Sequence, residues 1–293
     1  MDLAPYLLLA LLEGMVQASV LMLTALGLSL VFGVMRVVNV AHGQFFMLGA
    51  VGAWLCAQAI PGPPAIGFAV ALIAAPLAVG AIAWAADRAI LRRIGYDPEG
   101  TIVSTIGLLY ILQQSALIGF GPDARAVDPP FSHTLRTPWF GYSSYKLFIV
   151  AVAIALVAAL WLILRRTRLG LIMRATQFDR ETAQNFGIRV DRVYSAVFAV
   201  GAMLAAAGGV LVVPNQQAHY LMGTDPLLLS FVVVIVGGLG SLPGTIAAAV
   251  LIGLSDGLLS VFFSPTLAAI ASTLLVALVL IFRPQGLFGR AAA

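Results

Sequence analysis

Charged residues are scarce in this chain of 293 residues. Asp, Glu, Lys and Arg together make up 10% of it, where a soluble domain carries about 25%. Apolar types reach 61%, a fraction that a soluble protein of this size does not carry. Disordered chains are polar and charged, so disorder is excluded as well. The composition therefore indicates a membrane protein.

Residue types that carry common chemistry are equally scarce. The single lysine, Lys146, follows a tyrosine, so the chain has no P-loop to bind ATP. The single cysteine, Cys56, excludes a disulfide within the chain. The histidines His42, His133 and His219 lack the spacing of metal ligands. We therefore expect no enzyme and no cofactor or metal on this chain. We also expect no nucleic-acid partner, because the basic residues flank apolar segments.

Long charge-free runs fill most of the sequence, and crossing a bilayer as a helix takes about 20 apolar residues. The predicted fold class is an all-α polytopic membrane protein with about 8–9 transmembrane or re-entrant helices. The seventh and eighth are short and broken by glycine, which predicts half-helices or a re-entrant pair. The expected helices lie near residues 10–34, 44–60, 64–86, 101–120, 147–165, 193–213, 226–240, 243–261 and 266–282.

The basic residues predict the orientation. Most of the 16 Lys and Arg residues follow the first, third, fifth and last of these segments, and the positive-inside rule places those ends in the cytoplasm. The stretch 165–192 and the C-terminus then face the cytoplasm, while the loops 121–146 and 214–225 face outward. Residues 1–13 are expected at the membrane interface or at the start of the first membrane segment.

The longest polar stretch contains a predicted amphipathic helix over residues 170–188. Apolar or small residues recur on one face at steps of three and four, and Gly187 suits the position just past a helix end. The helix either lies on lipid headgroups or docks a cytosolic partner. The predicted stripe comprises Leu171, Ala175, Phe178, Thr182 and Phe186.

Residues 253–257 match G-x-S-x-G, the pattern around the nucleophilic serine of many hydrolases. That pattern needs a strand, a turn and a helix, whereas this one lies within an apolar helical run. We expect instead a packing face at which Gly253 and Gly257 let two helices approach closely, and a hydrolase that uses Ser255 is the rival interpretation. Asp256 is unusual at membrane depth, and it either lines a pathway or pairs near a helix end.

Asn39, His42 and Gln44 form a polar cluster near the start of the second helix. We interpret the cluster as capping at the cytoplasmic interface together with Arg36. The alternative is that these side chains form hydrogen bonds at an inner gate of a transport path.

Glycines at positions 237, 238 and 240, with Pro243, interrupt the helical pattern. Broken backbone at membrane depth persists only against protein or a water-filled cavity. Gly237, Gly238 and Gly240 therefore either line a translocation path or a tight subunit interface, or form a cytoplasmic turn between two helices.

Several strings resemble permeases of ATP-binding-cassette importers. Residues 181–187 are similar to the E-A-A-x-x-x-G loop of that class, with Glu181, Ala183 and Gly187 in the matching positions and Thr182 departing from the first alanine. Residues 38–49, 187–193 and 236–244 are similar to strings of the branched-chain amino acid permease family, in its H-type subunit. Gln44 and Asp256 stand where this family commonly has glutamate.

The resemblance implies a single transmembrane permease domain over 1–293, with a cytoplasmic coupling loop at 166–192. It implies a permease that imports branched-chain or other hydrophobic amino acids, or related solutes such as urea, amides or aromatic acids. Its location would be the bacterial inner membrane. The implied partners are a second, related permease subunit, two cytosolic ATPases that bind ATP and Mg²⁺, and an extracytoplasmic solute-binding protein.

The resemblance also suggests which residues carry function. The coupling contacts would come from Arg174, Phe178, Glu181, Ala183, Phe186 and Gly187. The translocation path would include Asn39, His42, Gln44, Gly237, Gly238, Gly240 and Asp256. The alternative is a stand-alone channel or secondary transporter. Ion coupling needs intramembrane charges, and Asp256 is the only acidic residue well inside an apolar run, which weakens that alternative.

Overall fold

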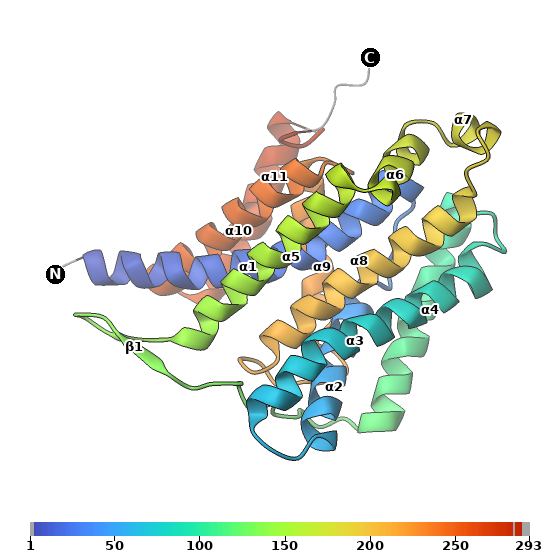
Figure 1. Cartoon of the computed structure of the whole chain (residues 1–293). Coiled ribbons are helices and arrows are strands. Elements are labelled where there is room, and N and C mark those ends of the chain that lie inside the picture. Colours follow the sequence, from blue (N-terminus) through green and yellow to red (C-terminus); the bar gives the residue numbers. More distant parts are fainter. Residues whose placement is uncertain (1–2, 284, 289–293) are drawn as a thin grey trace.

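The computed structural model describes residues 3–283 and 285–288. Each of the nine predicted membrane segments coincides with a helix (Figure 1). In the described part, 6 helices are long and apolar enough to cross a bilayer, so the all-α polytopic prediction is confirmed. The helices are α1 (Ala4–Met35), α2 (His42–Ala59), α3 (Pro64–Ala86), α4 (Pro98–Phe120), α5 (Ser144–Arg166), α6 (Arg168–Phe178), α7 (Arg180–Asn185), α8 (Val190–Val212), α9 (Thr224–Gly237), α10 (Leu242–Phe262) and α11 (Pro265–Phe282).

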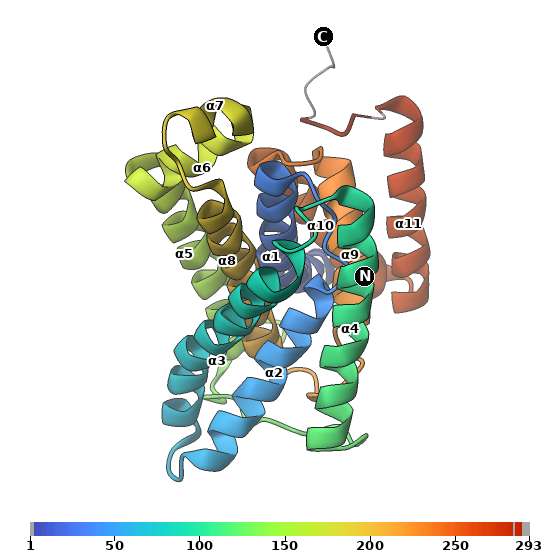
Figure 2. The ribbon, with the colours of Figure 1, turned by 90° about the vertical axis from the view of Figure 1, so that its right-hand side faces the viewer.

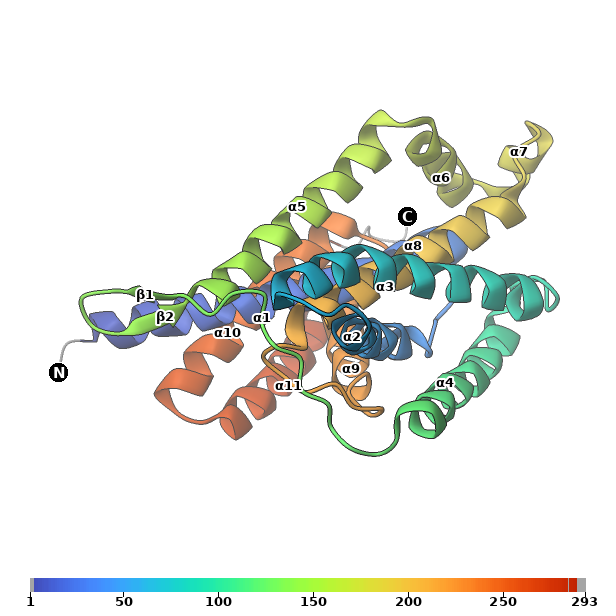
Figure 3. The same ribbon diagram turned by 60° about the horizontal axis from the view of Figure 1, so that its bottom comes forward.

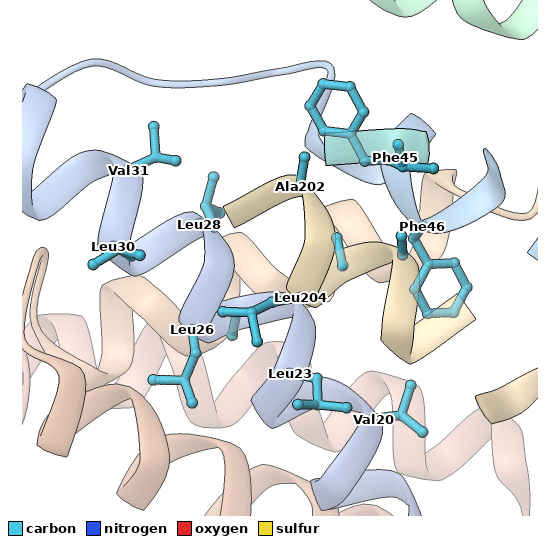
Figure 4. Close-up of a cluster of buried hydrophobic side chains, with 14 of the residues drawn as sticks. Val20, Leu23, Leu26, Leu28, Leu30, Val31, Phe45, Phe46, Ala202 and Leu204 are labelled. Atoms are coloured by element: carbon cyan, nitrogen blue, oxygen red, sulfur yellow. The ribbon is translucent and has the colours of Figure 1, made fainter. Parts of the chain in front are cut away.

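Helix α1 is central to the packing, with α8 and α10 along it (Figure 2). Every residue from Ser19 to Val31 is buried. Apolar side chains of α1, α2 and α8 form the core around this stretch, as Figure 4 shows for Leu23, Leu26, Phe45, Phe46, Ala202 and Leu204.

Small residues set the distances between these helices. Lipid is as apolar as leucine, so helices in a bilayer associate through close packing rather than through the hydrophobic effect. Where α1 crosses α8, a Cβ on Gly27 would overlap the carbonyl oxygen of Gly201. On α10, Gly253 packs on Ala18 and Gly257 packs on Gly14. The predicted packing face at residues 253–257 is thus confirmed.

The chain turns back into the molecule after α1, so α2 begins in the interior. Arg36 adopts the left-handed region with φ 57°, and Val37, Asn39 and Ala41 beyond it are buried. Nε2 of His42 lies 2.8 Å from the carbonyl oxygen of Thr24. Thr24 precedes the end of α1 by about 16 Å along the helix axis, so the start of α2 lies well below that end.

The segment 213–223 enters from the opposite end. Ala218 pairs with Arg125 through backbone hydrogen bonds of 2.8 Å, after which the chain continues inward until Gly223 packs against Gly43 of α2. The helix that follows, α9, has 14 residues, about 21 Å, which is shorter than a bilayer core of about 30 Å. The predicted outward loop 214–225 therefore re-enters the molecule.

The predicted re-entrant pair is only half correct. Helix α9 is a half-helix, but α10 runs without interruption for 21 residues. The glycines that suggested two broken helices lie in the turn between them, where they end α9 and precede α10.

The two ends of the molecule carry different elements. Helices α6 and α7 and the end of α11 lie at one end (Figure 2). A hairpin of β1 (Thr134–Arg136) and β2 (Gly141–Ser143) lies beside the first turns of α1 at the other (Figure 3). Residues 4–13 form the first turns of α1. Nζ of Lys146, at the start of α5, is 2.6 Å from Oε1 of Glu13. The sequence predicted only a loop where the hairpin forms.

Candidate functional site

Asn39, His42 and Gln44 lie in the interior at the start of α2, each with 1% of its surface exposed. The interpretation that they cap the interface with Arg36 is wrong, because the preceding segment carries them inward. The carbonyl oxygen of Thr24 can only accept a hydrogen bond. Nε2 of His42 therefore donates to it, which leaves Nδ1 as an acceptor.

These three side chains hold unused hydrogen-bonding atoms. Oδ1 of Asn39 accepts from the backbone N–H of Ala41 at 3.0 Å, so the amide sits at the first turn of α2. Among the described residues, Asn39 Nδ2, His42 Nδ1 and Gln44 Oε1 find no partner. Leaving such a group unpaired costs about 1–3 kcal/mol. The cluster is thus suited to take up a polar ligand or water, and its place in a translocation path stays a prediction.

The glycine string forms the turn between α9 and α10. Gly238 and Gly240 have φ values of 101° and 77°, which glycine adopts at little cost. Gly240 packs against Gly33 near the end of α1, and Gln177 of α6 also lies beside Gly33. The turn therefore brings α1, α6, α9 and α10 together. That Gly237, Gly238 and Gly240 line a path for solute stays a prediction.

Ser255 and Asp256 lie in the interior of α10, a continuous helix. A nucleophile elbow requires a strand-to-helix turn, so the hydrolase interpretation has no structural basis here. Asp256 is half-buried, next to the glycine that packs on α1. Its role in a pathway stays a prediction.

The predicted amphipathic helix 170–188 is two helices, because the chain breaks at Asp179. This residue has extended backbone with φ −150°. Its Oδ1 accepts from the backbone N–H groups of Glu181 and Thr182 and so caps α7. Hydrogen bonds from the hydroxyl and then the N–H of Thr182 hold the pKa of Asp179 below its ordinary value. A side chain that caps the backbone in this way favours ending one helix and starting another. Hydrophobic periodicity does not predict such a break.

The predicted coupling residues form an exposed surface at this end. Phe178 is 84% exposed and Phe186 is 83% exposed, whereas Ala183 is the buried residue of α7. Gly187 has φ 80° just past the end of α7, which confirms its predicted position. The other members of the predicted stripe and of the coupling set are exposed as well, namely Leu171, Arg174, Ala175, Glu181 and Thr182.

Asp87 was not among the residues predicted from the sequence. It is completely buried where α3 continues into a π-helical turn, Asp87–Leu91. Ser195 Oγ donates to Asp87 Oδ2 at 2.5 Å, and the Tyr96 hydroxyl lies 3.5 Å from the same oxygen. Such π-helical turns are rare and frequently occur at functional sites. The available signal was an aspartate at the end of an apolar run, which is equally typical of an ordinary membrane interface.

Aromatic contacts connect Asp87 to α7. The ring of Tyr96 packs edge-on against Tyr194 with centroids 4.8 Å apart. The guanidinium of Arg180, in the first turn of α7, lies 5.5 Å from the centroid of the Tyr194 ring. Arg92 and Asp191 add an ion pair of 3.1 Å beside this contact. The start of α8 is therefore in contact with both α7 and the end of α3.

Replacing Ser195 by alanine is expected to destabilise the chain by about 1–3 kcal/mol, because the buried carboxyl of Asp87 loses its shortest hydrogen bond. Thermal unfolding in detergent measures this change. Ser115→Ala on the exposed face of α4 is the matched control, with an expected effect within about 0.5 kcal/mol. Equal stability of the two variants would contradict the prediction.

A polytopic bundle with buried polar side chains, in which the segments before α2 and before α9 turn back into the interior, is typical of membrane transport proteins. The sequence model described as "Branched-chain amino acid transport system / permease component" matches residues 10–283. This chain belongs to that permease family.

Curated relatives extend over nearly the whole chain. The permease protein LivH of Salmonella typhimurium, of a high-affinity branched-chain amino acid transport system, is 27% identical over 97% of this chain and 96% of its own length. BraD of Pseudomonas aeruginosa, described likewise, is 27% identical over 96% of this chain and 95% of its own. The galactofuranose transporter permease of Escherichia coli is 26% identical over 50% of this chain and 46% of its own. No solved structure matches significantly.

Proposed function

We propose that this chain is the transmembrane subunit of an ATP-binding-cassette importer that carries branched-chain or other hydrophobic amino acids into the cytoplasm. The names of the relatives that match along nearly the whole chain support this solute class. Urea, amides and aromatic acids are the related solutes to test next. The inner membrane of a bacterium is the proposed location, with the C-terminus and α6–α7 on the cytoplasmic side.

The observation that carries the proposal is the apolar surface of α6 and α7. Two phenylalanines more than four-fifths exposed lie outside the predicted spans, at the end where the basic residues gather. Such large apolar side chains are typical anchors of a protein interface. The lone lysine, Lys146, excludes a P-loop, so the driving ATPases are separate chains, and ATP and Mg²⁺ are bound by them. A second permease subunit and an extracytoplasmic binding protein complete the proposed assembly.

Contacts of α6 and α7 supply a route from the ATPases to the membrane helices. Gln177 of α6 lies beside Gly33 at the end of α1, where the α9–α10 turn also packs. Arg180 of α7 lies against Tyr194 at the start of α8. A displacement of the docked helices would therefore move α1, α8 and the re-entrant α9 together, which opens one side of the path and closes the other.

A stand-alone transporter is the second candidate, and the energy source separates the two. The complete complex in proteoliposomes, with binding protein and radiolabelled leucine outside, is expected to take up leucine only when ATP is enclosed. Uptake with ion gradients collapsed by ionophores is expected to equal uptake without them. Uptake that persists without ATP, or that ionophores abolish, would favour the stand-alone transporter.

A further inference from the structure

The corner between α5 and α6 gathers three arginines. Arg165 and Arg166 lie in the last turn of α5, and Arg168 is the first residue of α6. Thr167 ends one helix and caps the other, because its hydroxyl accepts from the N–H of Gly170 at 3.2 Å. The corner lies at the outer edge of the bundle (Figure 2, Figure 3). Three guanidinium groups therefore extend from four consecutive residues at one exposed place.

The positive charges of the corner have no acidic partner among the described residues. All three arginines are exposed, and none of them forms a salt bridge with a described residue. The sequence has no Asp or Glu between Asp128 and Asp179. Guanidinium groups stay protonated in proteins, and charges closer than about 8–10 Å act on one another at physiological salt. An anion bound at the corner would relieve this repulsion.

The corner stands where α5 leaves the membrane. This helix is long and apolar enough to cross a bilayer, and it ends at Arg166. Trp161 lies about 8 Å of helix before that end, and the guanidinium of Arg165 lies 4.8 Å from the centroid of its ring. Tryptophan near the end of a span is typical of the boundary between acyl chains and headgroups. The arginines therefore lie at the level of the lipid phosphates.

Exposed apolar side chains adjoin the arginines on the membrane side. Leu162 of α5 and Leu169 of α6 are both exposed. Leu162 precedes Arg165 and Arg166 by three and four residues, so these side chains share one face of α5. Arginine binds phosphate through paired N–H donors. One face thus offers an apolar surface inside the membrane and guanidinium groups at its edge, which matches the acyl chain and the phosphate of one phospholipid.

The end of α3 is a second basic segment, and its charges are balanced by the chain itself. The guanidinium of Arg88 lies 4.0 Å from the centroid of the Trp84 ring there, as in the α5–α6 corner. Arg92 of this segment pairs with Asp191 at 3.1 Å, however, and three acidic residues lie between positions 87 and 99. An unbalanced cluster of arginines is therefore not a general property of the helix ends.

We propose that the α5–α6 corner binds an anionic phospholipid of the leaflet next to α6. Arg165, Arg166 and Arg168 hold the phosphate, and Trp161 and Leu162 pack along the first part of an acyl chain. The bound lipid holds the first turn of α6 at the membrane surface. This site depends neither on the solute that the chain carries nor on the ATPases.

Fluorescence quenching measures which lipid lies beside the corner. In a Cys56→Ala background, Leu162→Cys carries a bimane label, and the full chain is placed in phosphatidylcholine bilayers with a minor fraction of dibrominated lipid. Dibrominated phosphatidylglycerol is expected to associate about fivefold or more tightly than dibrominated phosphatidylcholine, because each arginine near the surface attracts anionic lipid. Ile102→Cys, near the acidic first turn of α4, is the control position without such a preference.

Two matched pairs of substitutions locate the preference. Arg165→Gln combined with Arg168→Gln is expected to bring the association constants of the two lipids within about twofold of each other. Arg88→Gln combined with Arg93→Gln at the end of α3 is expected to leave the preference unchanged. Each pair removes two positive charges, one of them stacked on a tryptophan.

Equal quenching by the two lipids at Leu162→Cys would overturn the proposal, and this result requires no arginine variant to fold. It is also the result expected if the corner binds an acidic surface of a partner protein instead. A preference that the Arg88 and Arg93 variant loses as well would assign it to net charge rather than to the corner. A preference that inorganic phosphate abolishes at constant ionic strength would indicate a site for free phosphate rather than for lipid.

Discussion

Replacing both Phe178 and Phe186 by serine is expected to detach the ATPase subunits from the permease. Each side chain is more than four-fifths exposed on the isolated chain, and burying a phenylalanine contributes about 1.5–3 kcal/mol. Losing both therefore weakens docking by about 3–6 kcal/mol, which corresponds to a hundredfold or greater rise in Kd. Co-purification of the ATPases and solute-stimulated ATP hydrolysis both measure the loss.

Phe263→Ser provides the control, because this phenylalanine is also exposed but lies at the far end of α10. It is expected to retain both the ATPases and the stimulated hydrolysis. If the double variant binds the ATPases as the wild type does, α6 and α7 lie on lipid headgroups instead, as the alternative interpretation of the amphipathic pattern holds.

Gly27→Ala is expected to destabilise the helix bundle strongly. The added Cβ would overlap the carbonyl oxygen of Gly201, and this backbone belongs to a helix that cannot yield as a side chain can. Overpacking of this kind costs about 1–3 kcal/mol, and more when the backbone must shift. A lower yield of monodisperse protein and a lower unfolding temperature in detergent are the expected observations.

Gly107→Ala on α4 is the matched control, since nothing lies within 4 Å of a Cβ placed there. Alanine favours a helix by up to about 1 kcal/mol relative to glycine, so this variant is expected to be as stable as the wild type or more so. If both variants behave alike, the closeness of α1 and α8 does not limit stability.

The sequence sufficed to locate the membrane helices, because a charge-free apolar run of about twenty residues is typical of a membrane-spanning helix. The packing role of Gly253 and Gly257 followed as well, since small residues four apart on a helix create a flat face. The position of Gly187 after α7 could be predicted from backbone preference alone.

The same reasoning could not predict how deep inside the molecule α2 and α9 begin, or which polar side chains are buried. Hydropathy shows that α2 and α9 are apolar. How deep inside the molecule each helix begins depends on contacts such as His42 with Thr24 and Gly43 with Gly223. The polar cluster at residues 39–44 looked interfacial for this reason. Asp87 was missed because its partner, Ser195, lies 108 residues away in the sequence. Periodicity reports on neighbours along one helix and carries no information on such pairs.

The central place of α1 has a consequence for how the protein is made. This helix is synthesised before α8 and α10, which enclose it. They follow about 150–240 residues later, so at about 5–20 residues per second α1 waits roughly 10–50 s for them. Two of its buried hydroxyls do not wait unsatisfied, because Ser19 donates to the Met15 carbonyl and Thr24 to that of Val20. The hydrogen bond between Thr245 and Ser29, at 2.9 Å, forms only when α10 arrives. Helix α1 is thus equipped to reside alone in the bilayer during biogenesis and to serve as the template on which the later helices assemble.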